Sequence, residues 1–419
     1  MQSEKKESMI KSFPQFKCIH VRKFCVLFFY AVSIVCFGHR SDSTEVCSLH
    51  TDSLISTSNQ LKADTGTVKK VKDNWWRRLI YGNKDRSFEK KIDVSFLPAP
   101  TYSIESELGI GGIFSALYRL DRQDSIMPPS DVSVGGKVSV TGFYAIQASG
   151  NNYFKGRRHR LSYRAVFANK PLDFWGISYD ACAHNTASSY TRQSTVVDVD
   201  YAWRAVGQFY VGASLEALYM NGRHLLEPAY LEGQRSEYYF TGIGVSVLYD
   251  TRDFLPNPQR GVYFMLKEMV YPSLLGTYHK SLFQTTVTFD AYQKVWKGGL
   301  LAFELYGRLN PQDTPWPLRE QVGSGVSRMR GYYEGQYMDC SQLSSQLELR
   351  QRVYKRIGLV AWGGGGIVFP SLGKIGKSRF LPNYGLGVRF EFKHNMNLRV
   401  DYGFGRHTRG VVFGFGEAF

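Results

Sequence analysis

The strongest constraint on the fold is an alternation of apolar and polar residues that begins at about Asp93 and continues almost to the last residue. Successive side chains of a β-strand point to opposite faces, so a period of two indicates strands with one apolar and one polar face. About fifteen such runs follow one another, the first at Ile104–Leu120, and no helical period interrupts them. The clearest run places Phe209, Val211, Ala213, Leu215, Ala217 and Tyr219 on one face and Gln208, Gly212, Ser214 and Glu216 on the other. The chain is therefore predicted to be all-β.

Two all-β architectures fit such a pattern, a soluble sandwich and a membrane barrel. Many of the runs reach the ~9–11 residues that a tilted strand needs to cross a bilayer. Their polar faces carry charges, and aromatic residues recur near their ends, as in the interfacial girdles of membrane barrels. A closed barrel also leaves no sheet edge exposed to lipid. We therefore predict a transmembrane antiparallel β-barrel over residues 93–419.

The N-terminus is typical of an exported protein. Basic residues precede a short apolar run from Phe24 to Phe37, which is the pattern of a secretory signal peptide. The run is short for an anchoring helix, and a lipidated Cys36 would be preceded by a small residue where this chain has Val35. We expect residues 1–38 to be the signal peptide, and residues 39–92, which are polar and basic, to form a largely disordered periplasmic tail. The expected location is the outer membrane of a Gram-negative-type bacterium.

The formal net charge of +16 raises the question of nucleic acid, but Lys and Arg are spread through the alternating runs rather than gathered in one patch. We expect no nucleic-acid partner, and instead contacts with outer-membrane lipids and lipopolysaccharide. Cys47, Cys182 and Cys340 follow the expected signal peptide. Their odd number and wide spacing fit neither a disulfide framework nor a metal site.

No arrangement of catalytic residues is visible in the sequence. A G-x-S-x-G nucleophile motif is absent, which argues against a lipase-type activity. The histidines lack the i, i+4 pairing of a zinc site, and the run Gly363–Gly366 lacks the Lys and Ser or Thr of a phosphate-binding loop. We expect no metal, no cofactor and no enzymatic activity, and a barrel enzyme that acts on lipids is the least favoured function.

Three segments carry more specific information. The first is a polar turn with Pro and Gly between two strand-like runs, and its marked residues are Asp250, Arg252, Asp253, Pro258 and Gly261. The second is Arg330-Gly331-Tyr332, within a stretch from Pro311 to Asp339 that has no clean strand. A connection of that length is usually functional. The third is the C-terminal run, which contains Phe413, Phe415 and Phe419.

In this order and spacing, the segments resemble the D-x-R-D…P-x-x-G strand junction, the R-G-Y/F lumen loop and the terminal strands of the BamA/TamA superfamily, also called bacterial surface antigens. The resemblance covers roughly Ile104 to Phe419. It implies a barrel of about 16 antiparallel strands with the long loop folded into the lumen. It also implies that the terminal phenylalanines act as a C-terminal signal.

The resemblance further implies that the loop arginine, Arg330, reaches into the lumen and pairs with acidic residues on neighbouring strands. Glu348 lies on the next strand between two outward-facing leucines, so we expect its side chain to point inward and to bind Arg330. The alternative is an exposed loop arginine that contributes little. On the following strand, Gly364 stands where the family offers a second acidic residue. That contact is missing or is supplied by another residue, such as Asp401.

The family's insertases also carry soluble POTRA modules, for which residues 39–92 are too few and too polar. Such modules capture client chains by adding strands to an exposed edge. We therefore expect a barrel-only member that takes part in outer-membrane protein assembly, insertion or translocation together with other outer-membrane or periplasmic assembly proteins. The alternative is a passive pore or a structural surface barrel that keeps the fold without the assembly activity.

Overall fold

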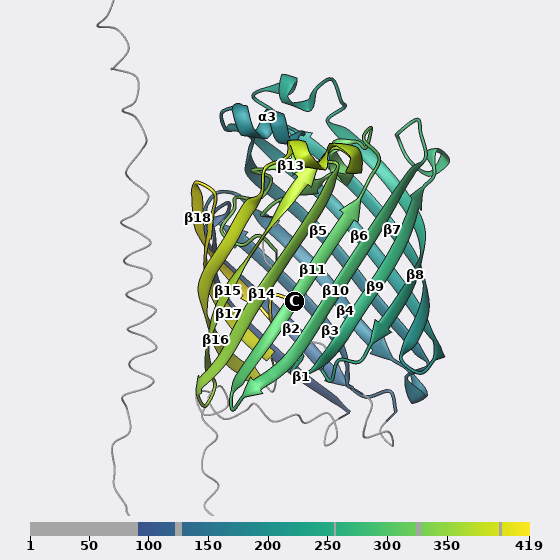
Figure 1. Ribbon diagram of the computed structural model, residues 1–419, viewed down its shortest axis with the longest axis vertical. Coiled ribbons are helices and arrows are strands. Elements are labelled where there is room, and N and C mark those ends of the chain that lie inside the picture. The colour runs from purple at the N-terminus through teal and green to yellow at the C-terminus, as the bar shows by residue number, and fades with distance from the viewer. Residues whose placement is uncertain (1–90, 122–127, 255–256, 324–327, 394–395) are drawn as a thin grey trace, which may run out of the picture. The chain divides into compact units, whose positions relative to one another are not determined.

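A computed structural model describes residues 91–121, 128–254, 257–323, 328–393 and 396–419. The expected signal peptide, residues 1–38, and nearly all of the expected tail, residues 39–92, lie outside these ranges. The described part contains one sheet of 16 antiparallel strands, bonded to one another in the order of the sequence, and a separate two-stranded ribbon. Figure 1 shows the large sheet curling round into a barrel. The predicted all-β barrel fold with sixteen strands is confirmed.

The strands of the barrel are long and are joined mostly by hairpins. They are β1 (Ile92–Ser103), β2 (Glu107–Tyr118), β3 (Ser130–Ser139), β4 (Tyr144–Tyr153), β5 (His159–Phe174), β6 (Ser188–Val206), β7 (Phe209–Arg223), β8 (Glu237–Asp250), β9 (Gly261–Tyr271), β10 (Leu282–Trp296), β11 (Gly299–Leu309), β14 (Ser341–Tyr354), β15 (Ile357–Phe369), β16 (Leu381–Lys393), β17 (Met396–Gly405) and β18 (Thr408–Phe415). The ribbon consists of β12 (Glu320–Gln321) and β13 (Met338–Asp339). The helical elements are α3 (Tyr179–His184) and the 3-10 turns η2 (Lys155–Arg157), η3 (Pro228–Leu231), η4 (Ser273–Leu275), η5 (Trp316–Leu318) and η6 (Leu372–Lys377).

The first strand of the barrel comes before the first predicted strand-like run. The sequence pattern placed the first run at Ile104–Leu120, but β1 precedes it and pairs with β2 along its whole length, from Ile92 opposite Tyr118 to Ser103 opposite Glu107. Pro98 and Pro100 lie inside β1. Proline cannot donate to a ladder and is confined to edge strands and bulges, and β1 is indeed one end of the sheet.

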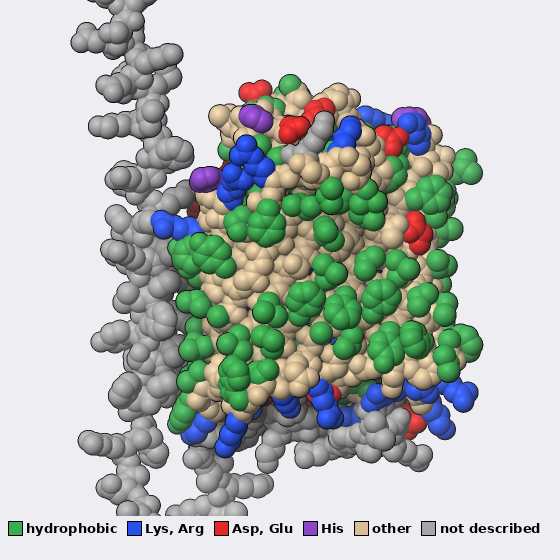
Figure 2. Space-filling view, in the orientation of Figure 1, with side chains coloured by type: hydrophobic (Ala, Val, Ile, Leu, Met, Phe, Trp, Pro, Cys, Tyr) green, Lys and Arg blue, Asp and Glu red, His purple; other side chains and the backbone are tan. Residues whose placement is uncertain are grey.

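The two faces of the barrel wall differ as the alternation predicts. Along β7, Val211 and Leu215 are exposed, whereas Tyr210 and Ser214 are buried towards the lumen. Figure 2 shows apolar side chains spread over the outer wall, with Lys and Arg along its lower rim. An outward apolar band with a polar interior is the pattern of a transmembrane barrel.

The connections between the strands range from two-residue turns to the long stretch between β11 and β14. A two-residue turn, Lys297-Gly298, joins β10 to β11, and Gly298 takes the positive φ of +78° that such hairpins require. Several of the longer connections pack with the adjoining strand ends in a hydrophobic cluster that includes Phe174 of β5, Tyr238 of β8 and Trp316 of η5. They also form α3, a six-residue helix that the period-two pattern did not predict, with Ser178 as its N-cap. Among the described residues, no helix is both long and apolar enough to span a bilayer.

The two ends of the sheet, β1 and β18, meet at a seam. Within the described residues no ladder joins these strands, although their Cα atoms approach within 8 Å. The side chain of Ile104, in the β1–β2 turn, packs directly on Gly410 of β18, where any Cβ would overlap it. The seam is therefore held by side-chain packing rather than by a continuous run of backbone hydrogen bonds.

Candidate functional site

The connection from β11 to β14 folds back into the barrel. Its ribbon pairs Glu320 with Asp339 and Gln321 with Met338. Trp316 and Met338 belong to the hydrophobic cluster formed with the longer connections. Because the loop buries apolar side chains of its own, it is a packed part of the structure that can hold a charged side chain in a fixed place.

Arg330 lies in this loop, and its side chain is completely buried. Its Nη2 atom lies 2.7 Å from Glu348 Oε2 on β14, and its Nη1 atom lies 2.8 Å from Asp401 Oδ2 on β17. Nη2 also donates to Gln346 Oε1 at 3.2 Å, and the guanidinium stacks 3.7 Å from the ring of Trp362. The structure thus brings together Arg330, Glu348 and Asp401. Gly364 lies on β15, and from this strand the ring of Trp362 contacts Arg330.

Further arginines, among them Arg350 and Arg389, surround the same carboxylates. Arg350 Nε lies 2.7 Å from Glu348 Oε1, and Arg389 Nη1 lies 2.5 Å from Asp401 Oδ1. Arg389 also binds Glu417, with 2.8 Å between Nε and Oε2. None of these five side chains is more than 8% exposed. In such a network each charge is stable only because its partners are present, so removing one leaves the others buried and uncompensated.

Gly331 and Tyr332 fix the backbone of the loop beside Arg330. Gly331 has a φ of +100°, and a Cβ at this position would overlap the backbone of Gly403 on β17. The Tyr332 hydroxyl donates to the carbonyl of Pro382 at 2.8 Å and accepts the amide of Arg406 at 2.7 Å. The motif therefore ties the loop to β16 and to the β17–β18 turn.

Glu334, four residues further along, ties the loop to the opposite side of the seam. Its carboxylate binds Lys170 at 3.0 Å and also binds Arg192, and its backbone amide donates to Glu105 Oε1 at 2.9 Å. Burial alone would raise the pKa of Glu334, but Lys170 and Arg192 lower it to about 2. Burial and the nearby Glu334 charge raise the pKa of Glu105, in the β1–β2 turn, above 4.5. The sequence gives no signal for this second anchor.

The strand-junction residues form a separate cluster at the start of the β8–β9 connection. Asp250 Oδ2 lies 2.7 Å from Arg160 Nη1, and Asp250 Oδ1 lies 3.0 Å from Arg252 Nε. Asp253 accepts the backbone amides of Phe254 and Gln259, both at 2.9 Å, and so closes the turn. Asp250 and Arg252 thus form ion pairs with each other, with Arg160 and, at 4.0 Å, with Asp290.

The other two residues of the junction motif shape its backbone. Gly261 has a φ of +109°, and a Cβ there would overlap the backbone of Thr251 across the turn. Pro258 is buried beneath the same turn. The motif therefore sets the connection between β8 and β9.

The C-terminal phenylalanines do not share one strand. Phe413 lies in β18 opposite Val400, and the backbone of Phe415 closes that strand opposite Leu398, while the side chain of Phe415 lies outside the described residues. The chain then turns at Gly416, with a φ of +76°. Phe419 leaves the wall and packs on Tyr292, with 6.2 Å between ring centroids. The expectation that the last run extends as a strand to Phe419 is therefore wrong, because Gly416 ends it.

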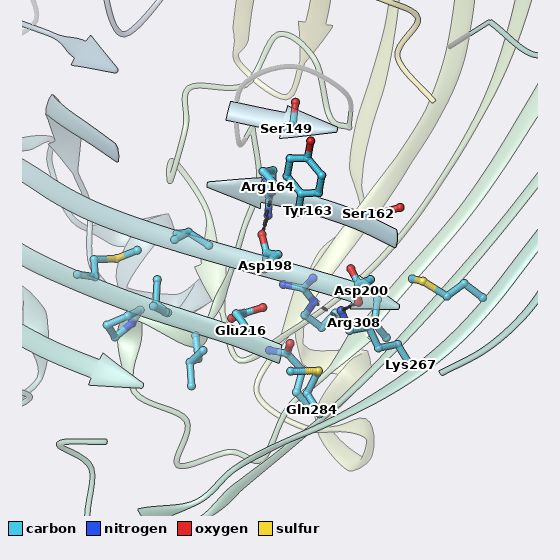
Figure 3. Close-up of a pocket in the computed structure, with 18 of the residues that line it drawn as sticks. Ser149, Ser162, Tyr163, Arg164, Asp198, Asp200, Glu216, Lys267, Gln284 and Arg308 are labelled. Atoms are coloured by element: carbon cyan, nitrogen blue, oxygen red, sulfur yellow. Dashed lines mark hydrogen bonds and ion pairs between the residues drawn. The ribbon is translucent and has the colours of Figure 1, made fainter. Parts of the chain in front are cut away.

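A cavity of about 520 Å³ lies in the lumen against the η5 segment of the loop. Charged side chains of both signs line it, and Figure 3 shows how they point towards one another. Arg164 and Asp198 approach to 2.6 Å, and Lys267 and Asp200 to 2.7 Å. Since opposite charges neutralise each other in pairs, the cavity has no strong field of one sign. The described residues contain no cluster of His, Cys, Asp or Glu that could hold a metal ion.

No protein-family model and no curated protein sequence matches this chain. Its fold is similar to that of CdiB from Acinetobacter baumannii, with 10% identity and a TM-score of 0.51 over 78% of this chain and 60% of that one. It is also similar to CdiB from Escherichia coli, with 11% identity and a TM-score of 0.52 over 78% of this chain and 63% of that one. A structure of BamA from Haemophilus ducreyi lacking POTRA domains 1-3 matches 78% of this chain and 69% of that one, with 11% identity and a TM-score of 0.46.

This chain therefore spans less than two thirds of the length of either CdiB chain that it matches. At identities near one residue in ten, the likeness concerns the fold and not the activity. The described residues thus form an antiparallel β-barrel whose fold is similar to that of CdiB, with a buried arginine holding a loop inside it.

Proposed function

We propose that this chain takes part in the assembly, insertion or translocation of proteins at an outer membrane, as a barrel of the BamA/TamA type working with partner proteins. The observation that carries the proposal is the loop that Arg330 anchors inside the lumen, beside a seam that no ladder closes in the part of the chain that the structure describes. A barrel that handles other chains uses a wall that can part.

The anchor and the seam are linked by contacts of the loop. Tyr332 binds the turn that leads into β18, and the amide of Glu334 binds Glu105 in the turn that follows β1. The loop therefore touches both ends of the sheet. Because opening the seam would move these turns apart, we infer that the loop holds the seam closed until partner or client chains compete for it.

The proposed location is the outer membrane of a Gram-negative-type bacterium, where outward apolar side chains such as Phe96, Phe114 and Leu215 would contact lipid. Outer-membrane lipids and lipopolysaccharide are the proposed lipid partners. Periplasmic or outer-membrane assembly proteins are the proposed protein partners. Co-purification from detergent-extracted membranes, with this chain as bait, would identify them.

A depletion experiment tests the proposed function. The chain is removed from the bacterium that makes it, the levels of other outer-membrane proteins are measured by quantitative proteomics, and the entry of a small solute is measured in the same cells. We expect several outer-membrane proteins to fall while solute entry does not fall. If their levels stay constant and solute entry falls, the chain is a passive pore and the proposal is wrong. If neither changes, it is a structural surface barrel and the proposal is equally wrong.

A further inference from the structure

The two prolines of β1 make the two sides of the seam unequal. Pro98 and Pro100 lie two positions apart in the strand. In a β-strand, successive residues direct their backbone N–H and C=O groups to opposite neighbours, so residues two apart address the same neighbour. Both prolines therefore withhold a hydrogen-bond donor from the same side of β1.

A hydrogen bond between β2 and β3 shows to which side of β1 the proline nitrogens point. The amide of Val140 donates to the carbonyl of Leu108, on β2, at 3.0 Å. The even-numbered residues of β2 therefore bond towards β3. No register shift interrupts β2 in either of its ladders, so its odd-numbered residues bond towards β1.

The register of β1 then places the prolines at the seam. Gly109 of β2 stands opposite Thr101 of β1, so the odd-numbered residues of β1 are those that bond to β2. Pro98 and Pro100 are even-numbered, and their nitrogens face away from β2. The nearest seam-facing amides on either side belong to Phe96 and Tyr102, about 20 Å apart along the strand.

A strand that added to this edge of β1 would lie in the hydrocarbon layer of the membrane. Over about 20 Å it would face no backbone N–H donor. Two of its carbonyl groups would find no donor on β1, and water cannot replace the missing bonds there. Prolines on an edge are a recognised way of blocking the addition of another strand. The seam edge of β1 is therefore a poor template for a ladder, which accounts for the absence of one between β1 and β18 within the described residues.

The edge of β18 has no such defect. The amide of Gly416 donates to the carbonyl of Asn397, on β17, at 2.7 Å. The even-numbered residues of β18 therefore bond to β17, and the odd-numbered residues Arg409, Val411 and Phe413 face the seam. Each of these three residues has a backbone N–H, and within the described residues none of them belongs to a ladder on that side.

We propose that β18, and not β1, is the edge to which an extended strand of another membrane protein adds. This inference rests on the proposed assembly function and assigns the place where the client or partner strand binds. The outward neighbours Val411 and Phe413 and the small inward residues Gly410 and Gly414 require a strand that alternates apolar and polar or small side chains. A strand from another barrel has this pattern.

A cross-linking experiment with a peptide probe tests the proposal in the purified full-length chain. The photoreactive residue p-benzoylphenylalanine replaces either Phe413, on β18, or Phe96, on β1; Phe96 is 59% exposed and serves as the matched site on the other side of the seam. The probe is a synthetic peptide with the sequence Ile92–Ser103 that carries P98T and P100T, so that it alternates correctly and has every donor. We expect adducts at position 413 and on the order of tenfold fewer at position 96, since each backbone hydrogen bond contributes a few-fold to affinity.

The same peptide with its natural prolines is the second probe, and it should give several-fold fewer adducts at position 413 than the peptide with threonines. Equal adducts at positions 96 and 413 would overturn the proposal, because the two edges would then be equivalent. A β18 adduct with a second copy of this chain in place of the peptide would also overturn it. Neither result depends on whether outer-membrane protein levels change on depletion, so failure of this inference and failure of the proposed function are distinguishable.

The Pro98→Thr and Pro100→Thr double variant of the full chain provides an independent measurement. Restoring two donors should let β1 pair with β18, slow hydrogen exchange in a peptide that covers Val411 and Phe413, and reduce the adducts with the added probe. Pro171→Thr is the control, because Pro171 lies in β5 beyond the last pair that β5 forms with β4. If exchange in β18 is unchanged in the double variant, the prolines do not keep the seam open and the inference is wrong.

Discussion

The Arg330 guanidinium lies 2.7 Å from the Glu348 carboxylate, and neither side chain has any exposure to solvent. Desolvating two charges is costly, and the pair is stable because the stack on Trp362 and the second carboxylate, Asp401, complete its surroundings. This contact therefore holds the loop in one position, and its loss should lower the free energy of unfolding.

Arg330→Ala should destabilise the folded barrel by about 3–5 kcal/mol, because it leaves Glu348 and Asp401 buried without their shared partner. The measurement is urea unfolding in detergent micelles, supported by the heat-dependent shift in gel mobility. Arg164→Ala is the control. Arg164 binds Asp198 but is 55% exposed, so its removal should cost only about 0–1 kcal/mol. Equal effects of the two substitutions would contradict the anchoring role.

Gly331→Ala should destabilise the barrel more than Gly142→Ala does. Both glycines have a positive φ, +100° and +80°, so alanine is strained by roughly 1–2 kcal/mol at either position. A Cβ at Gly331 also overlaps the backbone of Gly403, whereas nothing lies within 4 Å of one at Gly142. Unfolding free energies of both variants, measured under the same conditions, test this difference. A larger loss at Gly142 would show that the loop can move away from β17.

The ion pairs of Glu334 should make part of the stability depend on pH. The pKa of Glu334 is lowered from 4.5 to about 2, so its contribution is fully present above pH 4.5 and is lost as the pH falls through about 2. Glu334→Gln should therefore lower the unfolding free energy at pH 7, and the gap between wild type and variant should shrink below pH 4.5. Glu105 has the opposite sign, because its raised pKa favours the protonated form in the folded state.

Unfolding curves at pH 7, 5 and 3 for wild type and Glu334→Gln measure this gap, and Glu227→Gln, at an exposed position, is the control. Glu334→Gln also removes one of the two causes that raise the pKa of Glu105, so in the variant burial alone raises that pKa. A gap that stays constant down to pH 3 would mean that Glu334 does not hold its charge through Lys170 and Arg192.

Cys182 and Cys340 should resist thiol reagents in the folded barrel. Both are buried, and burial raises the pKa of Cys182 to about 12 and that of Cys340 to about 11, so little thiolate forms at neutral pH. Iodoacetamide labelling at pH 8, mapped by mass spectrometry, should modify both only after unfolding in urea. Labelling of Cys340 in the folded state would indicate that the lumen loop, which carries it, opens on that time scale.

The sequence predicts the barrel wall better than it predicts the site. A period of two is a local property, and it places residues such as Leu215 outside and Ser214 inside with no knowledge of their neighbours. It fails at β1, where Pro98 and Pro100 break the pattern for the same reason that they mark an edge. It also fails at Phe419, because a glycine with a positive φ ends the last strand.

Contacts between strands require a register that the sequence does not contain. Alternation can place Glu348, Arg389 and Asp401 on the inner face, but only the ladders show that Gly387 stands opposite Asp401 and that Arg389 therefore reaches it. Glu334 was not identified at all, because its partners Lys170 and Arg192 lie on β5 and β6, far from it in the sequence. The loop has no periodic pattern from which such distant contacts could be inferred.

The anchors of the lumen loop also give barrel formation a direction. Arg330 meets Glu348 and Asp401, which are 18 and 71 residues away, whereas Glu334 meets Lys170 and Glu105, which are 164 and 229 residues away. Closing a short stretch of chain costs less entropy than closing a long one, so near contacts form earlier. The C-terminal strands should therefore pack around the loop first. The N-terminal strands should join last, when Lys170 and Glu105 bind Glu334.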